Sequence, residues 1–150
     1  MIQDIIHTYL TDEKHDYPHL NEVDSIKYFN YVNENGYFVC EYEGNTLIGY
    51  MEVWRLEYSQ LCHLMSDMPF CIYDEQLRDG PICFISNYFV VEGHRNKDVH
   101  RKLEWKLYKE HGDFAFLAYK RQERFTGVKI YSFDKAFRKW IREEKLYGRV

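Results

Sequence analysis

The stretch Ile85–Leu103, ISNYFVVEGHRNKDVHRKL, decides which fold we expect for this chain of 150 residues. The β-branched and aromatic residues of Ile82–Val91 predict a buried strand, which a polar turn brings to an end. An amphipathic helix, Asp98–His111, begins directly after that turn. Such a junction binds anions, because the first N–H groups of a helix have no intrahelical partner and the helix dipole favours negative charge there. We therefore predict an anion site, with Arg95 and Lys97 beside the anion.

The segments on either side of this stretch predict further helices and strands. Asp24 and Asp134 are the predicted N-caps of two helices, Asp98 is a candidate for the same position in a third, and Gly36 is an expected C-terminal stop. The strands before and after the central helix should pair in parallel. We expect one α/β domain whose mixed, mostly antiparallel sheet has about six strands and is flanked by helices. The other expected helices are Met1–Leu10, Asp24–Asn35, 60–65 and 135–145, and the other strands are Tyr37–Tyr42, Thr46–Leu56, Phe114–Tyr119 and Val128–Phe133.

The composition bounds the class of protein. The chain is 45% hydrophobic and 18% aromatic, which is typical of a globular domain. It has no run of 18 apolar residues and no signal-peptide pattern at its start, so we expect neither a transmembrane helix nor attachment to a membrane. The four cysteines form no Cys-x-x-Cys pair, which favours reduced thiols and a cytoplasmic location.

Charge is unevenly distributed along the chain. Residues 1–93 carry 4 basic and 16 acidic side chains, whereas residues 94–150 carry 16 basic and 8 acidic ones. The basic half starts at the predicted anion site, which favours a polyphosphate ligand or nucleic acid as a partner. The alternative is that the two halves attract each other within the fold.

Two motifs resemble the GNAT superfamily of acyl-CoA-dependent N-acyltransferases. The segment FVVEGHRNKDVHRKL is similar to that family's V-x-P-x-(Y/H)-R-G-K-G-(I/V)-G-x-x-L, with Asn96, Asp98 and His100 at the glycine positions and Glu92 at the proline. The hairpin YFVCEYEGNTLIGYMEV resembles the family's second and third strands, including the turn written E-x-G-x-x-I-G. The turn residues are Glu43, Gly44, Ile48 and Gly49, and the resemblance spans roughly Tyr37–Tyr119.

The resemblance implies a fold, a reaction and a site. The fold would be an acyl-CoA N-acyltransferase-like sheet, and the reaction would transfer acetyl from acetyl-CoA to an amine of a small molecule or a protein. Main-chain groups near Phe89, Val90 and Val91 would hold the pantetheine arm. The diphosphate would be bound by main-chain amides of the loop and by the basic side chains of Arg95, Lys97 and Arg101. The cofactor-binding residues of this loop and helix start would be Arg95, Asn96, Lys97, Asp98, Val99, His100 and Arg101.

The resemblance also implies groups for acid and base catalysis. A base must deprotonate the amine, and an acid must protonate the departing thiolate. The base could be Glu52, or a water held by Asn87. Family acids are often a tyrosine beyond the strand that follows the central helix, which makes Tyr119 and Tyr131 candidates.

The sequence is also compatible with functions other than an enzyme. The alternative function is a catalytically inactive protein of the same fold that binds a protein partner or nucleic acid, similar to small acetyltransferase-like proteins of tailed phages. The segment 106–133 interleaves basic and aromatic residues, a pattern that binds single-stranded nucleic acid but that strand alternation also explains. We expect no metal site, because His15 and His19 flank a proline and have no third ligand. Cys40 and Cys83 lie in apolar strands, where packing is their expected role.

Overall fold

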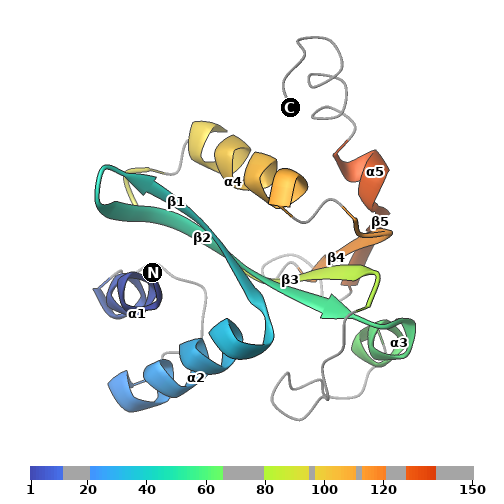
Figure 1. The fold of residues 1–150 in the computed structure, drawn as a ribbon, viewed down its shortest axis with the longest axis horizontal. Helices are drawn as coiled ribbons and strands as arrows, with labels where there is room; N and C mark the ends of the chain where they lie inside the picture. Colours follow the sequence, from blue (N-terminus) through green and yellow to red (C-terminus); the bar gives the residue numbers. More distant parts are fainter. Residues whose placement is uncertain (12–20, 66–79, 95–96, 111–112, 121–127, 138–150) are drawn as a thin grey trace. The chain divides into compact units, whose positions relative to one another are not determined.

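The computed structural model describes residues 1–11, 21–65, 80–94, 97–110, 113–120 and 128–137 (Figure 1). It is a mixed α/β structure, and the five strands within these residues form one sheet in the order β1-β2-β3-β4-β5, as part of the expected sheet of about six strands. None of the described helices is long and apolar enough to span a membrane. The elements in chain order are α1 (Ile2–Thr11), α2 (Glu22–Asn35), β1 (Tyr37–Glu43), β2 (Thr46–Leu56), α3 (Tyr58–Met65), β3 (Ile82–Val90), α4 (Lys97–Glu110), β4 (Phe116–Lys120), β5 (Val128–Ser132) and α5 (Phe133–Ala136).

The contacts within the chain divide it into two compact units. The first unit comprises residues 1–53 and 86–104, and the second comprises residues 54–85 and 105–150. The elements β2, β3 and α4 each contribute residues to both units.

The β1–β2 hairpin of the first unit turns in two residues, Gly44 and Asn45. Gly44 has a φ of 62° and Asn45 has a negative φ, which is the pattern of a type II′ turn with glycine at its first central position. Farther along the hairpin, Tyr42 pairs with Leu47 but Glu41 pairs with Gly49, so β2 has one extra residue at this step. Such a bulge allows Leu47 and Tyr50, three residues apart, to lie in the same core cluster.

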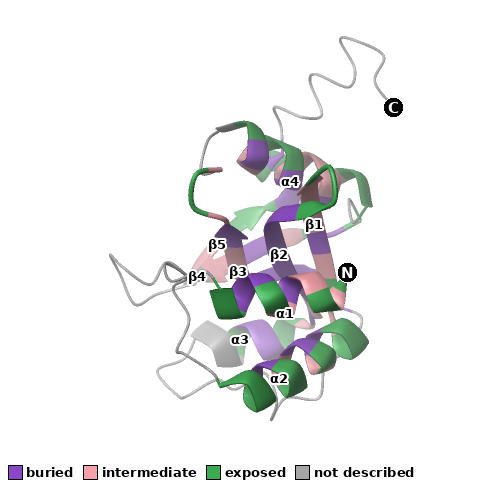
Figure 2. Cartoon of the chain, turned by 90° about the vertical axis from the view of Figure 1, so that its left-hand side faces the viewer, coloured by how far each residue is buried: buried purple, intermediate pink, exposed green. Residues whose placement is uncertain are grey.

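Helices α1 and α2 cover one face of the hairpin (Figures 1 and 2). Phe29 of α2 is fully buried, with its ring centroid 5.2 Å from Tyr9 of α1 and 6.4 Å from Tyr50 of β2. These edge-to-face contacts add to the stabilisation that the buried apolar area supplies. The cluster is completed by Ile5, Leu47 and Phe89.

The N-terminal half of α4 packs on the hairpin at Gly49. A Cβ atom at this position would lie 3.0 Å from Leu103 Cδ1 and 3.2 Å from both Val99 Cγ1 and Phe89 O. Val99 and Leu103 are buried one helical turn apart, as the apolar face of the helix requires. The second glycine of the hairpin motif therefore has a packing role, because it lets α4 approach the strand.

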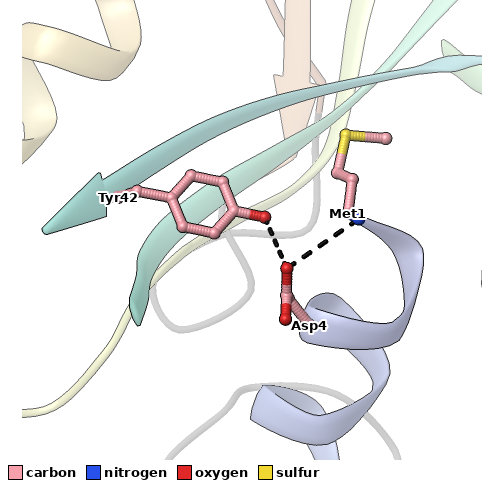
Figure 3. A network of polar contacts seen from close by, with 3 residues as sticks. All are labelled: Met1, Asp4 and Tyr42. Carbon is pink, nitrogen blue, oxygen red and sulfur yellow. Dashed lines mark hydrogen bonds and ion pairs between the residues drawn. The ribbon is translucent and has the colours of Figure 1, made fainter. Parts of the chain in front are cut away.

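A polar contact ties α1 to β1 at the edge of the first unit (Figure 3). The Tyr42 hydroxyl donates to Asp4 Oδ2 at 2.8 Å, and the Met1 amino nitrogen lies 3.8 Å from the same oxygen. Burial, followed by the adjacent Asp4 carboxylate, raises the pKa of Tyr42 to about 12.

The second unit is built on the parallel pairing of β3 with β4, as predicted. Pairing runs from Ile82 opposite Phe116 to Ile85 opposite Tyr119, and β5 adds to β4 in the antiparallel direction. Part of the core of this unit is a group of aromatic rings: the Phe133 ring centroid lies 5.5 Å from that of Phe114 and 4.5 Å from that of Phe137. The Arg55 guanidinium lies over the Phe114 ring, 4.2 Å from its centroid, and it donates a hydrogen bond to Asp113 Oδ1 at 2.6 Å.

The helix starts differ from the predicted ones. Asn21, not Asp24, caps α2, and its Oδ1 accepts from the Asp24 N–H at 2.8 Å. Ser132, not Asp134, caps α5. Asp98 lies inside the first turn of α4, so it is not an N-cap either. All three aspartates lie two or three residues past the cap position, where the helix dipole favours a negative charge as well.

Candidate functional site

A fully buried carboxylate lies on β2 of the first unit. Glu52 is 0% exposed, and within the described residues no other charged side chain is buried to this degree. Its Oε2 accepts hydrogen bonds from Tyr28 Oη of α2 at 2.8 Å and from Ser86 Oγ of β3 at 2.9 Å. Both donors are only partly buried, whereas the carboxylate that they contact is fully buried.

Two more polar side chains complete this group, which we call the Glu52 cluster (Tyr28, Tyr50, Glu52, Ser86 and Asn87). Asn87 Nδ2 lies 3.5 Å from the Tyr50 hydroxyl. Burial, followed by the negative charge of Glu52, raises the pKa of Tyr50, which therefore keeps its proton at neutral pH. The structure thus brings two predicted residues, Glu52 and Asn87, into one cluster.

The position of the cluster along β3 is informative. Ser86 is the residue that follows the last pairing of β3 with β4, at Ile85, although β3 itself continues to Val90. Ser86 and Asn87 are consecutive, yet they meet Glu52 and Tyr50, which lie two residues apart on β2. The two neighbouring residues of β3 thus link the strand to β2 at two points of the cluster.

The strand–turn–helix stretch follows the cluster directly. Val91 N donates to Ile48 O at 2.9 Å, so this N–H is used within the first unit. Phe89 and Val90 are buried. His94 N donates to Val91 O at 3.0 Å, and Gly93 has a φ of 87°, which is the geometry of a type II turn with glycine at its third position.

The first turns of α4 present a mixture of buried and exposed residues. Val99 is buried against β2, whereas Asp98 and Arg101 are exposed. The His100 ring packs on Tyr88, with 5.1 Å between centroids, and Tyr88 Oη donates to His100 O at 3.1 Å. Burial lowers the pKa of His100, which favours a neutral imidazole. The side chain at this glycine position is therefore accommodated by β3.

The two tyrosine candidates lie together in the second unit. Tyr119 of β4 and Tyr131 of β5 stack with 6.1 Å between ring centroids and 19° between ring planes. Tyr131 is 39% exposed and Tyr119 is partly buried. Either phenol can donate a proton, and their roles stay predictions.

The remaining predicted residues are those of the turn before α4, the histidines and the cysteines. Arg95, Asn96, His15 and His19 lie outside the described residues, as does the side chain of Lys97. Cys83 is buried, which raises the pKa of its thiol, and Cys40 is partly buried. In the described part of the chain, no three His, Cys, Asp or Glu side chains come together as metal ligands would.

The sequence did not point to Tyr28, Tyr50 or Ser86. Ser86 had a signal, because it stands with Asn87 as a polar pair inside the apolar run of β3. Tyr28 and Tyr50 had none: a tyrosine on an amphipathic helix or a strand is usually a core residue.

Comparisons with known proteins place the fold. No family model matches the chain, and no curated protein matches its sequence. The solved GNATL loading domain of CurA from Lyngbya majuscula is similar, with a TM-score of 0.55 and 10% identity over 79% of this chain and 58% of that one. PH1933 from Pyrococcus horikoshii OT3 has a TM-score of 0.52 and 12% identity over 94% of this chain and 78% of that one. The chain thus spans less than two thirds of the CurA domain chain, and these similarities show a GNAT-like fold.

Proposed function

We propose that this chain is an N-acyltransferase that moves the acetyl group of acetyl-CoA to an amine. The observation that carries the proposal is the buried carboxylate of Glu52 beside Ser86, at the point on β3 where the pairing with β4 ends. From there β3 leads through the Gly93 turn to the start of α4, the predicted anion site. Strand β3 therefore connects Ser86, the partner of the Glu52 carboxylate on β2, to the predicted anion site at the start of α4. Transfer from a diphosphate-bearing thioester requires both an acid–base group and an anion site.

The chemistry assigns roles to the cluster. The amine nitrogen bonds to the thioester carbonyl carbon, the C–S bond breaks, and CoA leaves as a thiolate that takes up a proton. Glu52 is our general base, because a carboxylate in a water-poor site is a candidate for proton transfer. Asn87, which contacts Tyr50, is the alternative through a bound water. Tyr119 or Tyr131 would supply the proton to the thiolate.

The residues at the start of α4 suit a diphosphate. Packing of Val99 and Leu103 on Gly49 fixes the direction of the helix, whose first N–H groups attract anions. Arg101 is exposed beside them, and the ring of His100 is turned onto Tyr88. Together with Arg95 and Lys97, Arg101 would hold the diphosphate.

The test is calorimetric binding of acetyl-CoA together with release of free thiol in the presence of amines. A panel of a polyamine, a peptide N-terminus, a lysine side chain and an amino sugar covers the acceptor classes. We expect micromolar binding, and Arg101→Ala should weaken it about tenfold, because a hydrogen bond to a charged group is lost. Lys109→Ala is the matched control, since Lys109 is exposed in the last turn of the same helix. Absence of both binding at millimolar acetyl-CoA and thiol release would refute the proposal.

The outer surface of α4 favours a second candidate function, nucleic-acid binding without catalysis. Arg101, Lys102 and Lys109 are all exposed on this helix. Under this alternative, Arg101→Ala and Lys109→Ala would weaken DNA retention by similar factors, with a steep dependence on salt. Acetyl-CoA would then leave the protein's melting temperature unchanged.

A further inference from the structure

We propose that Ser86 passes the proton of the acceptor amine to Glu52, so that the buried carboxylate acts as general base through a serine hydroxyl. The inference rests on the acyl transfer proposed above and deepens it by naming the group that meets the amine.

Because Glu52 is fully buried, its carboxylate does not contact the acceptor amine directly. Its side chain is 0% exposed, whereas Ser86 and Tyr28 are partly exposed and both donate to Glu52 Oε2. Each of these two hydroxyl groups therefore offers a route by which a proton can reach Glu52 Oε2.

The surroundings of the two hydroxyl groups favour Ser86. Tyr28 of α2 packs against the aromatic core, with its ring edge-to-face on Phe29 at 5.2 Å between centroids. Ser86 belongs to β3, the strand that leads to the Gly93 turn, and it follows the last residue paired with β4. We therefore assign Tyr28 a positioning role, in which its hydrogen bond holds the carboxylate toward Ser86.

The step balances. As the amine nitrogen bonds to the thioester carbon, its proton moves to Ser86 Oγ, and the Ser86 hydroxyl proton moves to Glu52 Oε2. The C–S bond breaks to release the thiolate. Glu52 then returns its proton to solvent, the thiolate takes one up, and the products are an amide and the CoA thiol.

Kinetics of matched variants test the relay. Ser86→Ala should lower kcat about 10²-fold, the usual contribution of a general base, while the Kd of acetyl-CoA stays unchanged. Ser86→Thr, which keeps a hydroxyl group, should retain most of the activity. Glu52→Gln should lose as much as Ser86→Ala, and the double variant should lose no more, because residues that act as a unit are not additive. Ser59→Ala, which removes an exposed hydroxyl on α3, is the control that should leave kcat unchanged.

A spectroscopic measurement tests the same contact without turnover. In infrared difference spectra against Glu52→Gln, the carboxyl band of Glu52 should shift in Ser86→Ala and stay in place in Ser86→Thr. If Ser86→Ala keeps wild-type kcat, or if the effects of the two single variants multiply, the relay is wrong and the acyltransferase proposal survives. If the wild-type protein neither binds acetyl-CoA nor releases thiol, the proposed function fails and the relay fails with it.

Discussion

Gly49 on β2 lies so close to Leu103 on α4 that a methyl group at Gly49 would come within 3.0 Å of Leu103 Cδ1. On another side, the same methyl group would be 3.2 Å from the carbonyl oxygen of Phe89, a backbone atom that cannot rotate away. The direction of α4, and with it the predicted anion site, therefore depends on the absence of a side chain at position 49.

Gly49→Ala should lower the free energy of unfolding by about 1–3 kcal/mol, because overpacking forces neighbouring backbone and side chains to shift. Urea denaturation measures the change. Thr46→Ala, at an exposed position of the same strand, should change stability by less than about 0.5 kcal/mol. Equal stability of Gly49→Ala and wild type would show that α4 does not pack on β2 as described.

Two glycines with positive φ form a matched pair for testing the anion site. Gly44 and Gly93 have φ values of 62° and 87°, and a Cβ at either would meet nothing within 4 Å. Alanine at each should therefore cost about 1–2 kcal/mol of stability through backbone strain alone. Only Gly93→Ala should also weaken acetyl-CoA binding, since Gly93 lies in the turn directly before α4 and Gly44 lies in the β1–β2 turn. If both variants changed the affinity for acetyl-CoA equally, the Gly93 turn would not be part of the binding site.

Tyr42 gives a prediction on alkaline stability. Its pKa in the folded state is about 12, against an ordinary value of 10.0. A raised folded-state pKa stabilises the protein fully below pH 10, and this stabilisation is lost as the pH rises toward about 12. Tyr42→Phe should therefore lose less stability than wild type between pH 10 and 12, measured by urea denaturation.

Asp4→Asn separates the two causes of that pKa. Burial is the first cause, and the hydrogen bond and the charge of Asp4 follow, so the variant should lower the pKa of Tyr42 while burial still keeps it above 10. Titration of ¹³C-labelled tyrosine by NMR gives the value. A pKa that does not move in Asp4→Asn would contradict the contact in Figure 3.

The Glu52 cluster should cost stability. Replacing a buried charge together with its hydrogen-bond partners by apolar groups is often neutral or stabilising by about 1–4 kcal/mol. The triple variant Tyr28→Phe, Glu52→Leu, Ser86→Ala should therefore unfold at the wild-type urea concentration or higher, and it should be inactive. A large loss of stability would mean that the cluster serves the fold.

The sequence predicted most elements because their periodicities are strong, but it misplaced the helix starts. An aspartate is stabilised at the N-cap by hydrogen bonds and in the first turn by the dipole, so Asp24 and Asp134 fit both positions equally well. The neighbouring Asn21 and Ser132 are the actual caps. Only the backbone geometry separates these alternatives.

The roles of the predicted site residues stay predictions, but two of these residues lie near each other in the structure. Glu52 and Asn87 stand out in apolar strands, and the structure brings them into one cluster. The sequence does not indicate that Tyr28 contacts Glu52, because the two residues are 24 positions apart. Their 2.8 Å hydrogen bond forms only when α2 packs on the sheet. A polar residue within an apolar strand can be recognised from its neighbours in the sequence. The hydrogen-bond partner of a buried carboxylate, in contrast, depends on tertiary structure.

The burial of Glu52 has a consequence for laboratory evolution of this chain. A library selected for heat resistance alone should accumulate apolar residues at position 52, because such a selection rewards the removal of a buried charge. A library selected for acyl transfer should retain the glutamate. The residue recovered at this single position would therefore record which of the two pressures had acted on the population.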